Sequence, residues 1–331
     1  MFKGLLSKKA LGLLLIVSFI FLILPQLLSR FYVYILAVIF VNGLLATSLN
    51  LVLGFGGMYQ FHHGVFYGFG AYTTALMITK AGGSYWLGFL AAPFAAALLG
   101  LIMGLICVRL SKLYFGMLQL SLGSLVWLIV YRWYSFTGGD DGIHGIPVPD
   151  LIYSTNGAYY FIFIVSAVCL TLMFLITKSP FGRAFQAIRD NPERCEALGI
   201  NVRRHQLIGL VFAALFAGVA GSLFVVVEGS VFPDLLFWHL SLEVFIMCLF
   251  GGWFIFLGPL LGAAAIISLR AFVSVYTDYW TAILGVIMML VIMFLPDGIL
   301  GYFQKKSIKY QDHIPLGGEL NVAGGEGSEI V

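Results

Sequence analysis

Charged residues are scarce in this sequence: they make up only 10% of its 331 residues, while 61% are hydrophobic and the mean hydropathy is +1.00. A soluble domain carries about a quarter charged residues, which cover its surface. This chain lacks the polar residues for such a surface, so a lipid bilayer must be its solvent. The net charge is only +3, and we expect membrane lipid rather than nucleic acid as its surroundings.

Motifs for metal binding and covalent chemistry are also missing. The four cysteines are isolated, with no Cys-x-x-Cys pair or zinc spacing, so we expect small buried hydrophobic side chains. No Gly-Lys-Ser/Thr phosphate loop is present, nor His-Glu-x-x-His or Gly-x-Ser-x-Gly. The sequence therefore predicts no catalytic residue, no metal site and no cofactor bound by this chain.

Long apolar runs, by contrast, are abundant. A membrane-spanning helix needs about 20 mostly apolar residues, and windows of that size predict an all-α polytopic membrane protein with about ten transmembrane helices or half-helices within residues 1–304. The expected spans are Ala10–Leu28, Tyr32–Leu53, Phe61–Thr79, Tyr85–Val108, Leu113–Trp133, Ala158–Thr177, Gln206–Val227, Phe237–Phe256, Leu257–Val275 and Trp280–Leu295. The eighth and ninth are short and interrupted by glycine, as half-helices would be. We expect the polar, glycine-rich tail, residues 305–331, to be disordered.

The basic residues test this topology independently. With the N-terminus in the cytoplasm, only four of the 18 Lys and Arg residues fall outside, namely Arg30, Lys80, Arg132 and Arg270. Cytoplasmic loops carry an excess of Lys and Arg. The sequence therefore predicts a multi-pass protein with both termini in the cytoplasm.

Charge is concentrated in residues 178–205, here named the charged segment, between the sixth and seventh spans. Ser179-Pro180 and Asn191-Pro192 are each typical of a helix N-cap followed by proline at the first helical position. Gly199 is placed to end the second helix in a left-handed conformation. We expect two short helices at an angle, just below the membrane.

The first of these helices carries an apolar stripe at spacings of three and four, formed by Phe181, Ala184, Phe185 and Ile188. Such a stripe with a charged rim could dock into a groove on another protein. The alternative is an ordinary solvated loop with an interfacial helix.

Polar side chains inside the spans are candidates for a solute pathway, because unsatisfied polar groups are expensive in hydrocarbon. We select Asn50, Gln60, His63, Tyr67 and Glu243, with helix packing as the alternative for each. Glu243, alone in an apolar run, should be paired, protonated or water-exposed. A metal at His62-His63 is disfavoured, since adjacent helical residues point about 100° apart.

The outer loop Thr137–Pro147 carries Asp140-Asp141 between glycines and no basic residue. Calcium binding is one interpretation, but the ligand spacing of an EF-hand is missing. We favour a tight, ordered turn region that contacts an external partner.

The charged segment also carries a family resemblance. Ser179–Val202, Ser-Pro-Phe-Gly-Arg-Ala-Phe-Gln-Ala-Ile-Arg-Asp-Asn-Pro-Glu-Arg-Cys-Glu-Ala-Leu-Gly-Ile-Asn-Val, resembles the cytoplasmic coupling segment of branched-chain amino-acid-type ABC importer permeases. Asn50–Ala75, Thr137–Pro147 and Glu243–Gly262 are similar to the family's other glycine-rich blocks, in family order. The likeness is strongest to the M-type permease subunit, although Gln60 and His62 depart from the usual pattern.

The resemblance implies a transport subunit of a bacterial inner membrane, without enzymatic activity of its own. Two cytoplasmic ABC ATPase subunits would bind ATP and Mg²⁺, a second homologous permease subunit would pair with this chain, and a periplasmic solute-binding protein would deliver substrate. Residues implied to couple to the ATPase are Phe181, Arg183, Ala184, Arg189, Asp190, Glu193, Glu196, Ala197 and Gly199. A urea or amide importer and a stand-alone secondary transporter stay open as alternatives.

Overall fold

The computed structural model describes residues 19–110 and 112–276, together with isolated positions between 279 and 301. Within these residues the chain is helical, and the one pairing of extended backbone is an isolated bridge between Ile143 and Val231. Residues 10–18 of the predicted first span, more than half of the predicted tenth span and the whole tail 305–331 lie outside the described residues. The all-α class predicted from composition is confirmed.

Among the described residues, five helices are long and apolar enough to cross a bilayer. They are α2 (Arg30–Leu53), α4 (Tyr85–Cys107), α5 (Lys112–Arg132), α8 (Thr155–Lys178) and α11 (Val202–Glu228). An α-helix satisfies its own backbone hydrogen bonds, which is why such runs become helices in lipid. They match the second, fourth, fifth, sixth and seventh predicted spans.

Three shorter helices complete the bundle: α3 (Gly64–Thr79), α12 (Trp238–Gly251) and α13 (Gly258–Val273). With 14 and 16 residues, α12 and α13 are about 21 and 24 Å long, less than the roughly 30 Å of a hydrocarbon core. The glycine-interrupted eighth and ninth spans were therefore predicted correctly as short. The third span begins three residues later than predicted, at Gly64 instead of Phe61. Residues 61–63 belong to a non-helical stretch, residues 54–63, that precedes α3.

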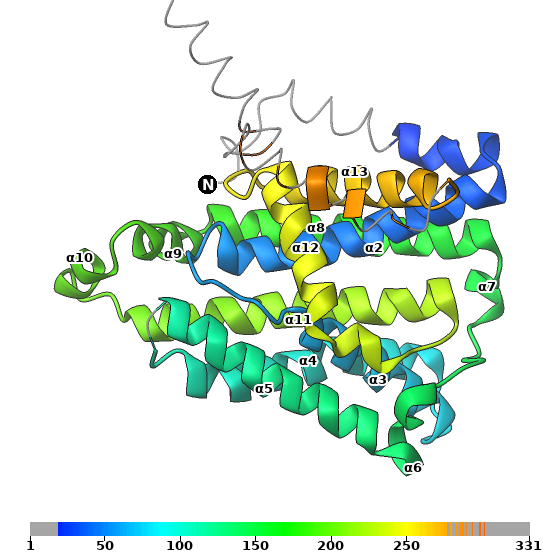
Figure 1. Ribbon diagram of the computed structural model, residues 1–331, viewed down its shortest axis with the longest axis horizontal. Coiled ribbons are helices and arrows are strands. Elements are labelled where there is room, and N and C mark those ends of the chain that lie inside the picture. The colour runs from blue at the N-terminus through cyan, green and yellow to red at the C-terminus, as the bar shows by residue number, and fades with distance from the viewer. Residues whose placement is uncertain are drawn as a thin grey trace, which may run out of the picture.

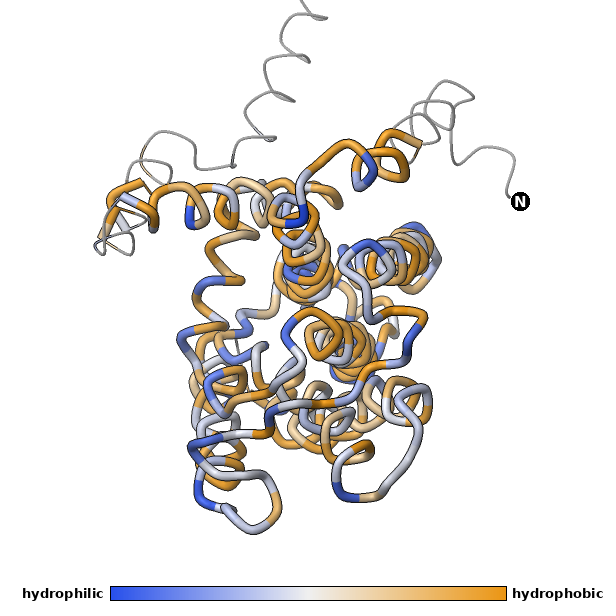
Figure 2. Tube along the Cα trace, turned by 90° about the vertical axis from the view of Figure 1, so that its right-hand side faces the viewer, coloured by the Kyte–Doolittle hydropathy of each residue, from blue (hydrophilic) through white to orange (hydrophobic). Residues whose placement is uncertain are grey.

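Helices α2 and α11 form the centre of the bundle. Their apolar windows are 78% and 72% buried, against 28–33% for α4, α5 and α8, which present apolar side chains outward as lipid-facing helices do. Small residues allow close packing at the centre: a Cβ on Gly218 of α11 would lie 2.6 Å from Cβ of Ala96 in α4. Figure 2 looks along the bundle and shows hydrophobic colour over most of the helical turns.

The two ends of the bundle differ in character (Figure 1). The charged segment forms α9 (Pro180–Asp190) and α10 (Pro192–Ala197) at one end, and α6 (Tyr134–Thr137) and α7 (Asp150–Tyr153) lie at the other. The predicted topology puts the charged segment and the outer loop on opposite sides of the membrane, and their placement at opposite ends of the bundle agrees with it.

The outer loop is the ordered turn region that its glycines predict. A short 3-10 turn, η1 (Gly139–Asp141), is followed by Ile143, which exchanges two backbone hydrogen bonds of 2.9 Å with Val231. Gly142 has a φ of +74° and a Cβ there would lie 2.2 Å from the Val231 carbonyl oxygen, so only glycine fits.

Candidate functional site

The charged segment has the helix caps that its sequence predicts. The side chain of Ser179 accepts a hydrogen bond of 3.2 Å from the amide of Gly182 at the start of α9. Asn191 does the same for α10, accepting from the amide of Arg194 at 3.0 Å. Each cap satisfies an amide that the first helical turn leaves without an intrahelical partner.

The end of α10 is fixed equally well. Gly199 has a φ of +82°, and its amide donates to the Glu196 carbonyl at 2.9 Å. The amide of Ile200 donates to the Cys195 carbonyl at 3.0 Å, which completes a Schellman motif. The charged segment is therefore a defined two-helix element.

The apolar stripe of α9, however, faces the protein's own bundle. Phe185 is 1% exposed, and a Cβ on Gly56 or Gly209 would lie 2.3 or 2.5 Å from its ring. Ile188 is 2% exposed. Docking of this stripe into a partner's groove, as the periodicity suggested, is wrong for these two residues, because Gly56 and Gly209 enclose Phe185 and Ile188 packs with Cys195 and Val202 of the same chain.

The outward face of the charged segment is mainly polar. Of the proposed coupling residues, Arg183, Asp190, Glu193, Glu196, Ala197 and Gly199 are exposed, whereas Phe181, Ala184 and Arg189 are half-buried. Leu198, at the tip of the segment, is 81% exposed. The surface available to a partner is thus a charged face with one protruding leucine.

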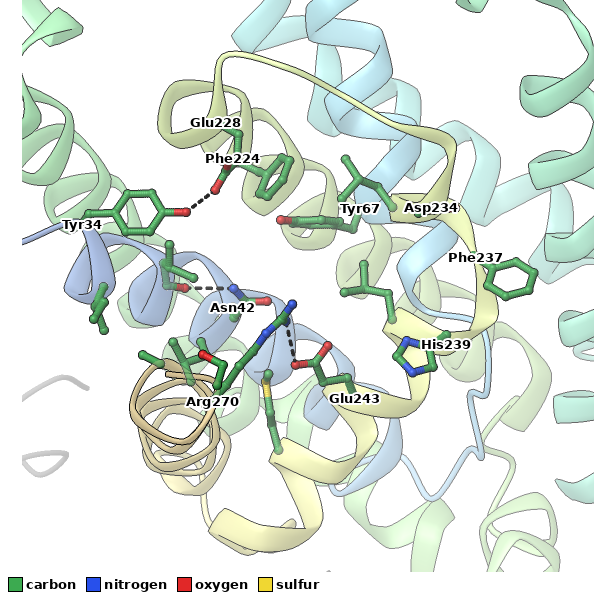
Figure 3. Close-up of a pocket in the computed structure, with 18 of the residues that line it drawn as sticks. Tyr34, Asn42, Tyr67, Phe224, Glu228, Asp234, Phe237, His239, Glu243 and Arg270 are labelled. Atoms are coloured by element: carbon green, nitrogen blue, oxygen red, sulfur yellow. Dashed lines mark hydrogen bonds and ion pairs between the residues drawn. The ribbon is translucent and has the colours of Figure 1, made fainter. Parts of the chain in front are cut away.

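A cavity of about 930 Å³ lies between α2, α3, α11, α12, α13 and the loop that contains η2 (Pro233–Leu236). Its walls are largely aliphatic and aromatic. Ten of its residues are labelled in Figure 3: Tyr34, Asn42, Tyr67, Phe224, Glu228, Asp234, Phe237, His239, Glu243 and Arg270. Its volume is in the range of small-molecule binding sites.

Two polar links cross the cavity between helices (Figure 3). The Tyr34 hydroxyl of α2 donates to the Glu228 carboxylate at the end of α11. Arg270 of α13 pairs with Glu243 of α12, with Nη1 and Oε1 3.4 Å apart and the Glu243 side chain only 12% exposed. The cavity therefore has charged groups within an otherwise apolar wall.

The five predicted pathway residues do not lie together. Tyr67 and Glu243 line the cavity, whereas Asn50, Gln60 and His63 are fully buried away from it. Asn50 Nδ2 donates to the Ile255 carbonyl at 3.5 Å, and His63 Nε2 lies 2.8 Å from Ser48 Oγ.

His62, which departs from the family pattern, has a packing role. Its ring nitrogens lie 3.1 Å from the Leu120 carbonyl oxygen of α5 and 2.7 Å from that of Leu236 in η2. A Cβ on Gly123 would lie 2.4 Å from the His62 ring, so this glycine makes room for it. The ring ties the non-helical stretch to two other elements.

Sequence reasoning missed several cavity residues. Glu228, Asp234 and Arg270 line the cavity, yet none of them was among the selected pathway residues, and Arg270 was counted with the external basic residues. Glu243 was expected to be paired, protonated or water-exposed, and the structure gives an ion pair with Arg270. The sequence offered one signal for this ion pair: consecutive apolar runs carry opposite charges, Glu243 in one and Arg270 in the next.

In the outer loop, the Tyr134 hydroxyl donates to Asp141 Oδ2 at 2.6 Å, and this hydrogen bond raises the pKa of the phenol. The adjacent His144 Nε2 lies 2.7 Å from the Asp141 carbonyl oxygen. The first contact ties α6 to the outer loop, and the second lies within the loop. Both stabilise its turns.

Comparison with known proteins agrees with this architecture. A family described as "branched-chain amino acid transport system / permease component" matches residues 31–293. The chain is 28% identical to the high-affinity branched-chain amino acid transport system permease protein LivM of Escherichia coli over 303 residues, covering 83% of this chain and 71% of that protein.

More distant similarities extend to LivH and NupQ. LivH of E. coli, from the same transport system by name, is 27% identical over 78% of this chain and 90% of its own length. The guanosine ABC transporter permease protein NupQ of Bacillus subtilis is 29% identical over 25% of this chain and 26% of its own. No solved structure matches. Because the family match covers most of the sequence, this chain belongs to the branched-chain amino acid transport system permease family.

Proposed function

We propose that this ABC importer permease carries branched-chain amino acids through the cavity between α2, α11, α12 and α13. The observation that carries the proposal is the combination of an aliphatic wall with charged groups of both signs. Side chains such as Ile35, Val38 and Ile267 suit an aliphatic side chain. Glu243 and Arg270 suit an ammonium and a carboxylate.

The charges also help to separate the candidate solutes. Three carboxylates, Glu228, Asp234 and Glu243, line the cavity with the guanidinium of Arg270. Three carboxylates against one guanidinium favour a solute that brings a positive group. An α-amino acid provides an ammonium, whereas urea and guanosine are uncharged, so the amino acid is the better match.

The machinery around this chain is proposed from the family. One of two cytoplasmic ATPase subunits, which bind ATP and Mg²⁺, docks on the outward face of the charged segment. A second permease subunit pairs with this one, and a periplasmic binding protein delivers solute at the opposite end of the bundle. Both termini then lie in the cytoplasm of a bacterial inner membrane.

Asn50, Gln60 and His63 are proposed to belong to the inner part of the pathway. Asn50 Oδ1, both amide atoms of Gln60 and His63 Nδ1 are buried and have no hydrogen-bond partner among the described residues. Buried polar atoms need a partner, and water or a passing solute can supply one.

The test is uptake by the complex purified from its native host and reconstituted in liposomes with its binding protein. Labelled leucine, urea and guanosine are offered separately, with and without internal ATP. We expect saturable leucine uptake that requires ATP, and no uptake of the other two above empty liposomes.

Two outcomes would contradict the proposal. Uptake of urea or guanosine in place of leucine would show that the cavity chemistry was misread. Leucine uptake by this chain alone, without ATP, would indicate a secondary transporter.

A further inference from the structure

Arg189, in the last turn of α9, turns toward the bundle and away from the outward face. Its Nη1 donates to the carbonyl oxygen of Gly54 at 2.8 Å, and its guanidinium carbon lies 5.2 Å from the centre of the Phe254 ring. Asp190 holds the other side of the guanidinium, with Oδ1 2.8 Å from Nη2. The Arg189 side chain is 26% exposed, against 67% for Asp190.

The contact with Gly54 closes the end of α2. The last carbonyls of a helix have no intrahelical donor and carry partial negative charge, so a guanidinium there is favourable. Gly57 has a φ of +66°, and a Cβ on it would lie 2.6 Å from Arg189 Cγ. Glycine at this position lets the arginine reach α2.

The contact with Phe254 reaches the connection between α12 and α13, residues 252–257. This connection also packs on α2, since a Cβ on Gly54 would lie 1.9 Å from the Trp253 carbonyl oxygen. Phe256 contacts Phe174 of α8, with ring centres 5.4 Å apart. Arg189 therefore joins the charged segment to α2 and to the 252–257 connection at one point.

Helices α12 and α13 are packed backbone to backbone. A Cβ on Gly262 would lie 1.9 Å from the Met247 carbonyl oxygen, and one on Gly251 would lie 1.8 Å from that of Gly258. Such close approach leaves little freedom for one helix to slide past the other. The pair continues to the cavity, where it carries Glu243 and Arg270.

We propose that Arg189 is a positioning residue that links the charged segment to α2 and to the α12–α13 pair, and is not a contact to the ATPase. When α9 is displaced, α2 and the α12–α13 pair move with it. These elements form two walls of the cavity, and the helix pair moves as a rigid unit. This inference rests on the proposed function, because it assumes that a partner displaces α9.

The test compares Arg189→Ala, Arg189→Lys and Phe254→Leu in the reconstituted complex. The control is Arg109→Ala, an exposed arginine outside both the charged segment and the cavity. ATPase co-purification, ATP hydrolysis and leucine transported per ATP are measured for each variant.

We expect Arg189→Ala to keep the ATPase bound and hydrolysing, and to transport about tenfold less leucine per ATP, the factor expected for one lost charged hydrogen bond. Arg189→Lys retains a cation and recovers part of the ratio. Phe254→Leu removes only the ring contact and keeps the hydrogen bond to Gly54, so it lowers the ratio by less. The double change Arg189→Ala with Phe254→Leu lowers the ratio no further than Arg189→Ala alone, because that change already breaks the contact with Phe254.

Loss of ATPase co-purification in Arg189→Ala, with Phe254→Leu behaving as wild type, would overturn the inference and make Arg189 a partner contact. An unchanged transport ratio in both variants would also overturn it. Failure of the wild-type chain to retain any ATPase would instead contradict the proposed function, so the two failures are distinguishable.

Discussion

Glu243 and Arg270 place opposite charges on the wall of the cavity, with side chains that are 12% and 53% exposed. Their separation of 3.4 Å makes them partners across α12 and α13. A pair that only stabilised packing could be replaced by apolar residues at little cost. Its position on the wall of the cavity favours a role in holding the solute.

Removing the charge of Glu243 tests that role. Glu243→Gln keeps the shape of the side chain, removes the anion that faces an ammonium, and should raise the KM for leucine about tenfold or more. Initial uptake rates over a range of leucine concentrations measure the effect. Asp150→Asn, an exposed carboxylate in α7, is the control and should leave KM unchanged. An equal KM in both variants would place the solute elsewhere.

The glycines of the α12–α13 contact make a stability prediction. Gly262→Ala places a methyl group against the Met247 backbone, and we expect a loss of about 1–3 kcal/mol in the free energy of unfolding, as for overpacked cores. Thermal unfolding in detergent gives the comparison. Gly285→Ala, with no atom of the described residues within 4 Å of its Cβ, should be at least as stable as wild type. A Gly262→Ala protein as stable as this control would show that the helices can separate freely.

At the residue scale, the sequence flagged Glu243 but not its partner. An acidic residue in an apolar run is visible in one sequence, whereas the ion pair depends on how α12 folds back on α13. Arg270 was counted with the external basic residues, although it lies near the end of the predicted span Leu257–Val275. Gln60 and His63 were chosen for their polarity, which does not reveal whether a side chain faces a cavity or a helix.

At the scale of elements, the charged segment follows local rules. Asn191 caps α10, and Asn191→Ala should destabilise this short helix by about 1 kcal/mol, whereas Asn191→Ser retains an acceptor and most of the stability. Hydrogen exchange at the α10 amides measures local opening directly. Equal exchange in the Ala and Ser variants would mean that the cap contributes nothing to α10.

Those same local rules explain which element features could be predicted. Caps and the stop at Gly199 depend on neighbours within a few residues, so Ser179-Pro180 and Asn191-Pro192 were read correctly. The stripe on α9 was recognised as apolar, but its partner was not, because the socket comes from Gly56 and Gly209, distant in sequence. The break after Leu53 was predicted, but the start of α3 was placed at Phe61, three residues too early, because the contacts that hold His62 outside the helix come from distant elements.

For the whole molecule, the predicted sidedness can be tested with thiol labelling. The four native cysteines are buried, so introduced cysteines are the reactive ones. Leu151→Cys in α7 and Leu198→Cys beyond α10 start from exposures of 77% and 81% at opposite ends of the bundle. With an impermeant maleimide outside an intact inner membrane, we expect labelling of Leu151→Cys alone. Labelling of Leu198→Cys alone would invert the topology.

Docking of an ABC ATPase subunit on the charged segment is the claim on which the other proposals depend. Cross-linking from this segment tests it. Leu198→Cys is treated in native membranes with a short thiol-to-amine reagent, and the product is identified by mass spectrometry, with Leu151→Cys as control. We predict a cross-link from Leu198→Cys to an ABC ATPase subunit and none from Leu151→Cys. Absence of any ATPase cross-link at Leu198→Cys, or its appearance at Leu151→Cys, would contradict the claim.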